Sequence, residues 1–197
     1  MTHKSEILKA LRKNLLPEPA LPSLDQEWIV YEDINAQFEQ SVAAVGGQCH
    51  FVDNISDVQT RLGEIEPYRD GKKICSLVNG VEGNVDLDQI DDPHELEDVD
   101  FAVARGHFGV AENGAIWVTD EHVKHRVVLF LSQHISLIIP KSELVNNMHE
   151  GYARVKHVGG VFGVFISGPS KTADIEQSLV IGAHGARSMN VFVVENV

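Results

Sequence analysis

Three apolar runs in the second half of the chain constrain its fold more than any other feature. They are His134–Ile139, which Pro140 ends, then Gly159–Ser167, and finally Asn190–Val194. Runs that are apolar at nearly every position suit strands buried on both faces, as in parallel sheets covered by helices. Helical patterns separate the runs, so we predict an α/β fold with a mostly parallel sheet flanked by helices.

The remaining segments complete a single structural domain with an N-terminal helical part. We predict helices at Ser5–Leu15, Ile34–Val45, Ser56–Ile65, 142–156 and from Ala173 onward, and strands at Gln48–Val52 and Lys73–Val78. Three prolines after the first helix indicate an extended linker. We expect residues 1–70 to form a helical segment packed on an α/β core of residues 71–197.

A tight turn in the middle of the chain carries a candidate catalytic residue. The sequence predicts a pair of strands at residues 100–110 and 115–119. Asn113-Gly114 between them favours the positive φ angles of a hairpin turn. Glu112 beside this turn can project into a cleft as a nucleophile or base. The alternative is a turn that faces solvent.

Charge excludes several classes of partner. The 197 residues include 16 Lys and Arg against 29 Asp and Glu, a formal net charge of −13. This disfavours nucleic acid and anionic lipid. No apolar stretch reaches the roughly 18 residues of a membrane span, and Met1–Ile7 has no signal core, so we expect a cytosolic protein. Nine acidic residues lie within Glu82–Asp100, which we interpret as a solvated loop or a face for a basic partner.

Cysteine and histidine spacing gives no metal site. The only cysteines, Cys49 and Cys75, lie far apart, and two thiols cannot hold an iron–sulfur cluster, which needs four protein ligands. We expect both to be reduced core residues. His122 and His125 are three residues apart, but no third ligand is evident.

The segment Phe165–Glu176 is a candidate anion site. An apolar strand runs into Gly168-Pro169 and then a predicted helix start with the hydroxyls of Ser170 and Thr172 and the amine of Lys171. Unpaired backbone N–H groups at a helix start attract anions. The alternative is an ordinary helix cap, with Asp174 or Glu176 as the reciprocal partner.

A second candidate lies just downstream, in Gly182–Ser188. His184 can exchange a proton near neutral pH, and Arg187 can hold a carboxylate or phosphate through paired N–H groups. The alternative is a glycine stop at the end of a helix, where the two cations complement the helix dipole.

Three blocks together resemble the LUD-domain family. Ser167–Glu176 reads SGPSKTADIE, Leu179–Gly185 follows it, and Ala111–Ala115 is similar to the turn that the family carries between two strands. Asn113, Ala115 and Ala186 depart from the family pattern. The resemblance implies a fold similar to that of CoA transferases and ribose-phosphate isomerase. It also implies a role in oxidising lactate to pyruvate, with the iron–sulfur clusters on separate partner subunits and no cofactor on this chain.

Our main hypothesis is therefore a non-redox subunit of a lactate-oxidising system. A small anion would bind between Gly168–Thr172, Asp174 and Arg187, with His184 positioning or exchanging a proton and Glu112 at the rim. Glu112-Asn113-Gly114 is also similar to the Glu-Asn-Gly of class I CoA transferases, so an acyl- or CoA-transferring enzyme is the rival. A pure scaffold or regulatory protein is the third hypothesis.

Overall fold

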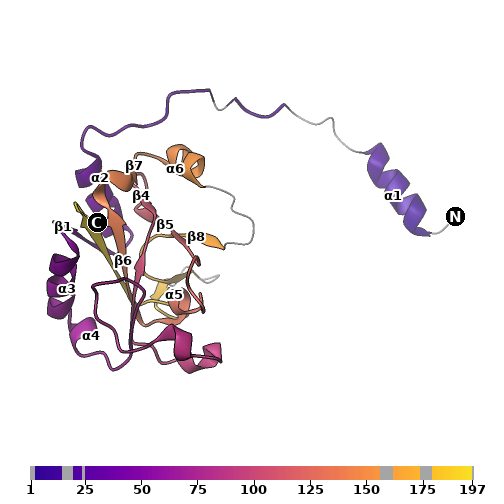
Figure 1. The fold of residues 1–197 in the computed structure, drawn as a ribbon. Coiled ribbons are helices and arrows are strands. Elements are labelled where there is room, and N and C mark those ends of the chain that lie inside the picture. Colours follow the sequence, from indigo (N-terminus) through magenta and orange to yellow (C-terminus); the bar gives the residue numbers. More distant parts are fainter. Residues whose placement is uncertain (1–2, 15–19, 24, 156–161, 174–178, 197) are drawn as a thin grey trace.

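A five-stranded, fully parallel sheet forms the centre of the computed structural model (Figure 1). The structure describes residues 3–14, 20–23, 25–155, 162–173 and 179–196. The strand order is β1-β11-β6-β3-β2, with the bounds β1 Gln48–Val52, β11 Ser188–Val194, β6 His134–Pro140, β3 Phe101–Arg105 and β2 Ile74–Ser76. The predicted parallel sheet is confirmed, and the apolar runs His134–Ile139 and Asn190–Val194 form its neighbouring strands β6 and β11.

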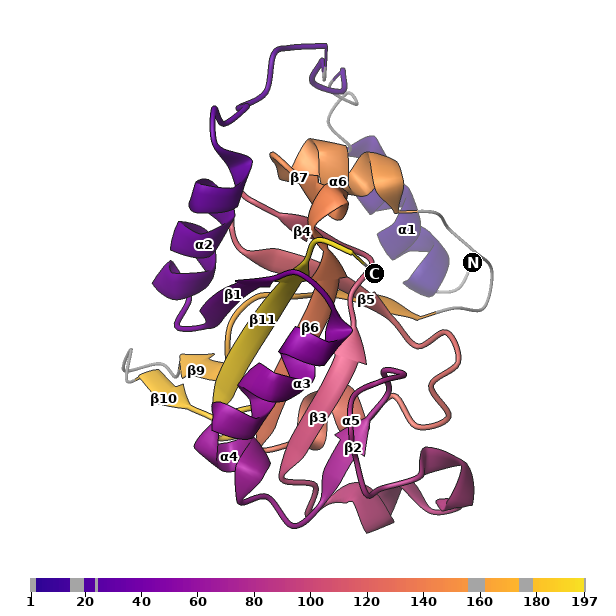
Figure 2. The same ribbon diagram turned by 60° about the vertical axis from the view of Figure 1, so that its left-hand side comes forward.

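Helices α3 (Ile55–Glu64) and α4 (Glu66–Arg69) cover one face of this sheet (Figure 2). Val58 and Leu62 of α3 pack with Phe101, Ile138 and Phe192 of the three central strands. These strand residues can share the face that packs on α3 because successive side chains of a strand point to opposite faces of the sheet.

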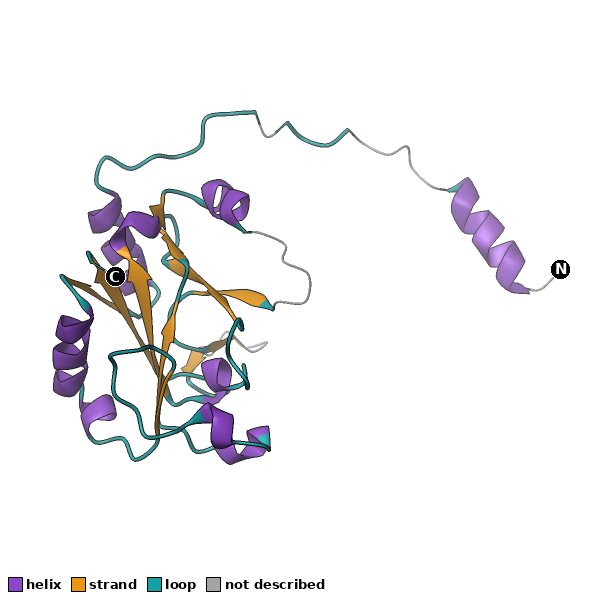
Figure 3. Ribbon diagram, viewed as in Figure 1, coloured by secondary structure: helices purple, strands orange, loops and turns teal. Residues whose placement is uncertain are grey.

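The opposite face packs against α2 (Ile34–Ala44), α5 (Val128–Leu131) and a second sheet. This second sheet has the order β7-β4-β5-β8, with the bounds β7 Leu144–Val145, β4 Phe108–Val110, β5 Ala115–Thr119 and β8 Gly163–Ile166. Phe38 and Val42 of α2 belong to the same main core as Leu137 of β6 and Ile116 of β5. The two sheets therefore share one core (Figure 3).

The turn between β4 and β5 is as predicted, but the strand before it is not continuous. Gly114 has φ +65°, and Val110 pairs with Ala115 in antiparallel register. Residues 100–110 split into β3, which joins the parallel sheet, and β4, which joins the second sheet. Gly106 lies between them, and it has no room for a side chain because Ile116 and Ile139 crowd its Cα.

The predicted helix from Ala173 is wrong for the residues that the structure describes. Lys171–Ala173 is strand β9, and it pairs in antiparallel register with β10, Leu179–Ile181. Thr172 faces Val180 in this pairing, and β-branched residues of this kind favour strands over helices. The predicted helix at 142–156 is also shorter, because a 3₁₀ turn η3 (Lys141–Glu143) and β7 precede α6 (Met148–Arg154).

The N-terminal part differs from the expected packed helical segment. Helix α1 (His3–Lys13) forms as predicted but buries none of its residues, and it lies apart from the sheets in Figure 1. Helices α2 and α3 do pack on the core. Because β1 is an edge strand of the parallel sheet, residues 48–52 belong to the α/β core rather than to a separate segment.

The acidic loop is solvated but anchored. It contains two 3₁₀ turns, η1 (Leu87–Gln89) and η2 (Pro93–Leu96), and it buries Leu96 and Val99 in the main core while its carboxylates stay at the surface.

Among the described residues, none of the helices combines the length and the apolar character that a membrane crossing needs.

Both cysteine thiols are free. Cys75 is buried and Cys49 is half-buried. Burial raises the pKa of Cys75 to about 11, and burial together with the nearby charge of Glu39 raises the pKa of Cys49 to about 12. Since the thiolate is the nucleophile and metal ligand, neither side chain is reactive at neutral pH.

Candidate functional site

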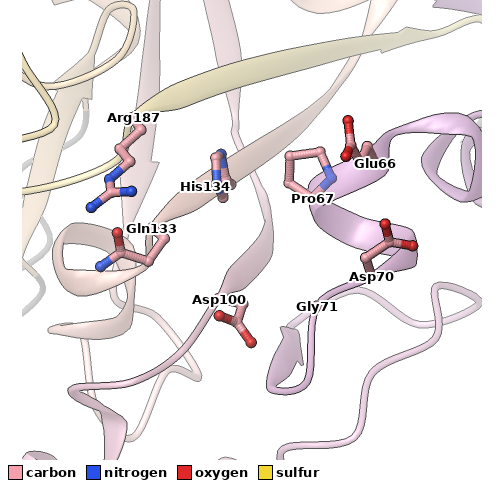
Figure 4. Close-up of a pocket in the computed structure, with 8 residues that line it drawn as sticks. All are labelled: Glu66, Pro67, Asp70, Gly71, Asp100, Gln133, His134 and Arg187. Carbon is pink, nitrogen blue, oxygen red and sulfur yellow. The ribbon is translucent and has the colours of Figure 1, made fainter.

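A cavity of about 340 Å³ lies at the amino ends of the parallel strands (Figure 4). Asp100, Gln133 and Arg187 each directly precede one strand, β3, β6 and β11 respectively. Backbone hydrogen bonds hold these three positions in line: Arg187 N–H donates to the Gln133 carbonyl at 2.7 Å, and Gln133 N–H donates to the Val99 carbonyl at 3.1 Å. The parallel register therefore gathers three polar side chains at one edge of the sheet.

The cavity has two walls of different character. The first holds Arg187, Gln133 and His134, the first residue of β6. The second wall comes from α4 and the turn after it and contributes Glu66, Pro67, Asp70 and Gly71. Figure 4 shows the guanidinium and amide groups on one side and the carboxylates of Glu66 and Asp70 on the other.

Two of the three carboxylates are already engaged. Arg69 donates two hydrogen bonds to Asp70, at 2.8 and 3.1 Å. Asp100 accepts the backbone N–H groups of Lys72 and Lys73 through one oxygen, at 2.7 and 3.0 Å. By contrast, the Arg187 guanidinium has no hydrogen bond or ion pair with any residue that the structure describes. Among the described residues, Arg187 is therefore the cation of this cavity that has no carboxylate partner.

His134 sits at the base of the cavity in a partly buried position. Its Nδ1 lies 2.8 Å from the Ser188 hydroxyl oxygen on β11. Burial lowers the His134 pKa from its ordinary value, the Arg187 charge lowers it further, and Asp100 opposes the shift. The imidazole is therefore neutral at pH 7 and can either donate or accept a hydrogen bond.

The titration of His134 tests this electrostatic arrangement. We expect its NMR-detected midpoint to lie below 6.5, to rise in Arg187→Gln, which removes a cation, and to fall further in Asp100→Asn, which removes an anion. Because the pKa is depressed by folding, the neutral imidazole supports stability above pH 6.5, and this support is lost as the pH falls below that value. Movement of the midpoint in the same direction in both variants would contradict the arrangement.

Polar side chains continue from the cavity along the same face of the sheet. Ser136 and Asn190 are neighbours on β6 and β11, and both are buried. Asn190 Oδ1 lies 3.1 Å from His50 Nε2, whereas the Ser136 hydroxyl has no hydrogen-bond partner among the described atoms. Polar residues inside the apolar runs of a covered parallel sheet are unusual, and they mark this face as specialised.

The predicted anion segment packs on the end of helix α2. Lys171 Nζ donates to the Val45 carbonyl at 2.5 Å, so its charge complements the carboxyl end of α2. Gly168 has φ +73° and lies against the same carbonyl. The predicted helix start is wrong for the described residues, because β9 begins at Lys171 and Thr172 pairs within the hairpin, and the anion site itself stays a prediction. Asp174 lies outside the described residues.

This segment instead supports the loop that carries Arg187. Ser170 N–H donates to the Ala186 carbonyl at 2.7 Å, and the Ser170 carbonyl accepts from Gly182 N–H at 2.9 Å. His184 in the same loop is exposed and bonds to none of the described residues. The strand β10, rather than the predicted helix, leads into this loop. Ser170 and Arg187 are thus brought together, while His184 faces solvent.

Glu112 is held at the start of α6. Its carboxylate accepts the Met148 N–H at 2.8 Å, and its own N–H donates to the Asn146 carbonyl at 3.0 Å. An acid at this position satisfies a free N–H group and complements the helix dipole. The Asn113 carbonyl of the same turn accepts the Ser167 hydroxyl at 2.9 Å. Glu112 as an acyl-forming nucleophile stays a prediction that these contacts do not favour.

Sequence reasoning missed most of the cavity. Asp100, Gln133 and His134 were not singled out as site residues, although each stands at the start of an apolar strand. Polar residues directly before parallel strands are the signal that identifies them, because such positions converge on one edge of the sheet. Within the described ranges, no three His, Cys, Asp or Glu side chains gather into a group that could hold a metal ion.

Comparison with known proteins places these features in a family. A model of the LUD domain matches residues 77–194, which include β3, β6, β11 and Arg187. The chain belongs to the LUD domain family. The match leaves out α4, so the acidic wall of the cavity lies outside the matched part of the LUD domain.

Two relatives illustrate the similarity to curated proteins. The LUD domain chain is 34% identical over 107 residues to lactate utilization protein C of Shouchella clausii, covering 52% of this chain and 47% of that protein. It is 36% identical over 109 residues to lactate utilization protein C of Halalkalibacterium halodurans, with the same coverage. The chain spans about half the length of the curated relatives it matches.

A solved structure shares the fold. A DUF162 family protein from Deinococcus radiodurans superimposes with a TM-score of 0.59 at 18% identity, covering 82% of this chain and 96% of that one. At this identity the likeness concerns the LUD domain fold alone.

Proposed function

We propose that this LUD domain serves lactate utilization as a non-redox subunit that holds a small hydroxy- or oxo-carboxylate. The observation that carries the proposal is Arg187, a cation without a carboxylate partner among the described residues, on the wall of the cavity at the amino ends of the strands. The names of the two relatives support the pathway.

The chemistry of lactate suits the two walls of this cavity. A guanidinium pairs with a carboxylate through two parallel hydrogen bonds. The hydroxyl of a 2-hydroxy acid can donate to a carboxylate of the opposite wall, where Glu66 lies. The neutral His134 can hydrogen-bond either to this hydroxyl or to the carbonyl of the oxidised acid.

Electron transfer belongs to other subunits in this proposal. Oxidation of lactate to pyruvate removes two electrons and two protons. The chain has two cysteines, both with raised pKa values, and a four-thiolate cluster needs twice that number. We therefore assign the electrons to separate iron–sulfur partner proteins, while this chain binds the acid or docks the partner.

The proposal predicts a selective growth defect. In a strain that lacks the gene, the wild-type chain should restore growth on L-lactate, and Arg187→Gln should restore it poorly while growth on glucose stays normal. Loss of a charged hydrogen-bonding partner costs roughly 1.5–3 kcal/mol, or about tenfold to hundredfold in affinity.

Arg154→Gln is the matched control. Arg154 of α6 pairs with Glu143 of η3 at 2.6 Å, away from the cavity, and its loss should leave growth on lactate unchanged. Normal lactate growth of the deletion strain would exclude a role in the pathway. Equal growth of the two variants would exclude Arg187 as the anchor of the acid.

A further inference from the structure

A second cavity, of about 290 Å³, lies at the opposite end of the parallel sheet. It opens where β3 ends at Arg105 and β5 ends at Thr119, and α5 closes one side through Leu129. In open α/β sheets, ligands bind outside the carboxyl ends of the strands. This cavity has that location, whereas the Arg187 cavity lies at the amino ends.

The inner wall of this second cavity is apolar and rigid. Ala104, Val118 and Leu129 line it, and all three are buried members of the main core. Binding sites for small molecules combine such a wall with a few fixed polar groups and span about 300–1,000 Å³. A volume of about 290 Å³, just below this range, suits a small metabolite.

The polar rim offers an unpaired cation. Arg105 lines the cavity and forms no side-chain hydrogen bond or ion pair with the described part of the chain. Four other arginines each pair with a carboxylate, namely Arg61, Arg69, Arg126 and Arg154. In a chain with a net charge of −13, an arginine beside an apolar pocket that has no carboxylate partner among the described residues is notable.

His107 fixes a second polar group on the same rim. Its Nε2 lies 2.8 Å from the Thr119 hydroxyl oxygen, which orients the ring. Its Nδ1 has no partner among the described residues. Glu121 is the acid on this rim, and it lies 3.8 Å from His122, which has a left-handed backbone with φ +63°.

We propose that this second cavity binds a small organic acid with an apolar body. The carboxylate pairs with Arg105 and reaches His107, and the apolar part packs on Ala104, Val118 and Leu129. The site differs from the Arg187 cavity in edge, wall and cation, so it goes beyond the proposed function and can fail or succeed separately from it.

NMR titration of the whole chain tests this assignment. The probes are 4-methyl-2-oxopentanoate, which has a branched apolar body, and inorganic phosphate, which has none. The reporter is the imidazole of His107. We expect the branched acid to shift this signal in the millimolar range or below, and phosphate to bind at least several times more weakly.

Two substitutions separate the sites. Arg105→Gln should weaken binding at His107 by roughly tenfold or more, as loss of a charged hydrogen bond does. Arg187→Gln and Arg126→Gln should leave it unchanged, and dispersed amide signals would show that each variant is folded. An unmoved His107 signal, equal binding of phosphate, or unchanged binding in Arg105→Gln would each overturn the proposal.

Discussion

Gly168→Ala is expected to lower the free energy of unfolding by about 2–5 kcal/mol. Gly168 has φ +73°, a conformation that costs an L-residue about 1–2 kcal/mol. An added methyl group would also collide with the Val45 carbonyl oxygen at the end of α2. That backbone atom cannot move without disturbing the helix end, so overpacking adds about 1–3 kcal/mol. Urea denaturation monitored by circular dichroism measures the change.

Gly63→Ala is the matched control for this change. Gly63 lies inside α3, and nothing is within 4 Å of the position that its Cβ would occupy. The same added methyl group should therefore stabilise the chain by up to about 1 kcal/mol, because alanine favours a helix over glycine. Loss of stability in both variants alike would contradict the reason given for Gly168.

Since Gly168–Ser170 supports the Arg187 loop, Gly168→Ala should also weaken carboxylate binding at Arg187.

Leu137→Ala is expected to destabilise the chain by about 2–5 kcal/mol. Leu137 is fully buried in the middle of β6, between the strands β11 and β3. Its side chain packs in the core that joins the parallel sheet to α2 and the second sheet. Shortening it removes apolar contacts and leaves a cavity that the rigid sheet cannot fill. The midpoint of urea unfolding should fall, with the slope unchanged.

Leu11→Ala makes the same chemical change in α1. Leu11 is 60% exposed, and α1 buries none of its residues. We therefore expect its unfolding free energy to stay within about 0.5 kcal/mol of that of the parent chain. A loss comparable with that of Leu137→Ala would mean that α1 packs on the domain, as the sequence suggested.

Local patterns predicted the elements whose stability depends on local chemistry or on full burial. The apolar run His134–Ile139 predicted β6, and the Asn113-Gly114 pair predicted the turn between β4 and β5. Helices α2 and α3 form at the ranges that the sequence predicted. In each case the signal lies within about a dozen consecutive residues, so the sequence of that segment is enough to predict the element.

The hairpin of β9 and β10 shows where prediction from neighbouring residues alone is wrong. Ser170-Lys171-Thr172 has the hydroxyls of a helix cap, yet Lys171–Ala173 pairs with Leu179–Ile181 and Lys171 reaches the end of α2. A cap is worth about 1 kcal/mol. Pairing with a strand and packing on a distant helix can outweigh it, and neither partner is visible in the segment itself.

The sequence by itself determined the α/β class, the parallel sheet, the excess of acid, the family motifs and Arg187 as a candidate anion ligand. Only the tertiary structure decided which residues meet around it. Parallel strands align their amino ends, and this brings Gln133, His134 and Asp100 next to Arg187 around the cavity. Glu112 lies elsewhere, because its carboxylate accepts a free N–H at the start of α6. Whether these side chains lie close together depends on the order and register of strands that are distant in the sequence, and no local spacing of residues predicts either.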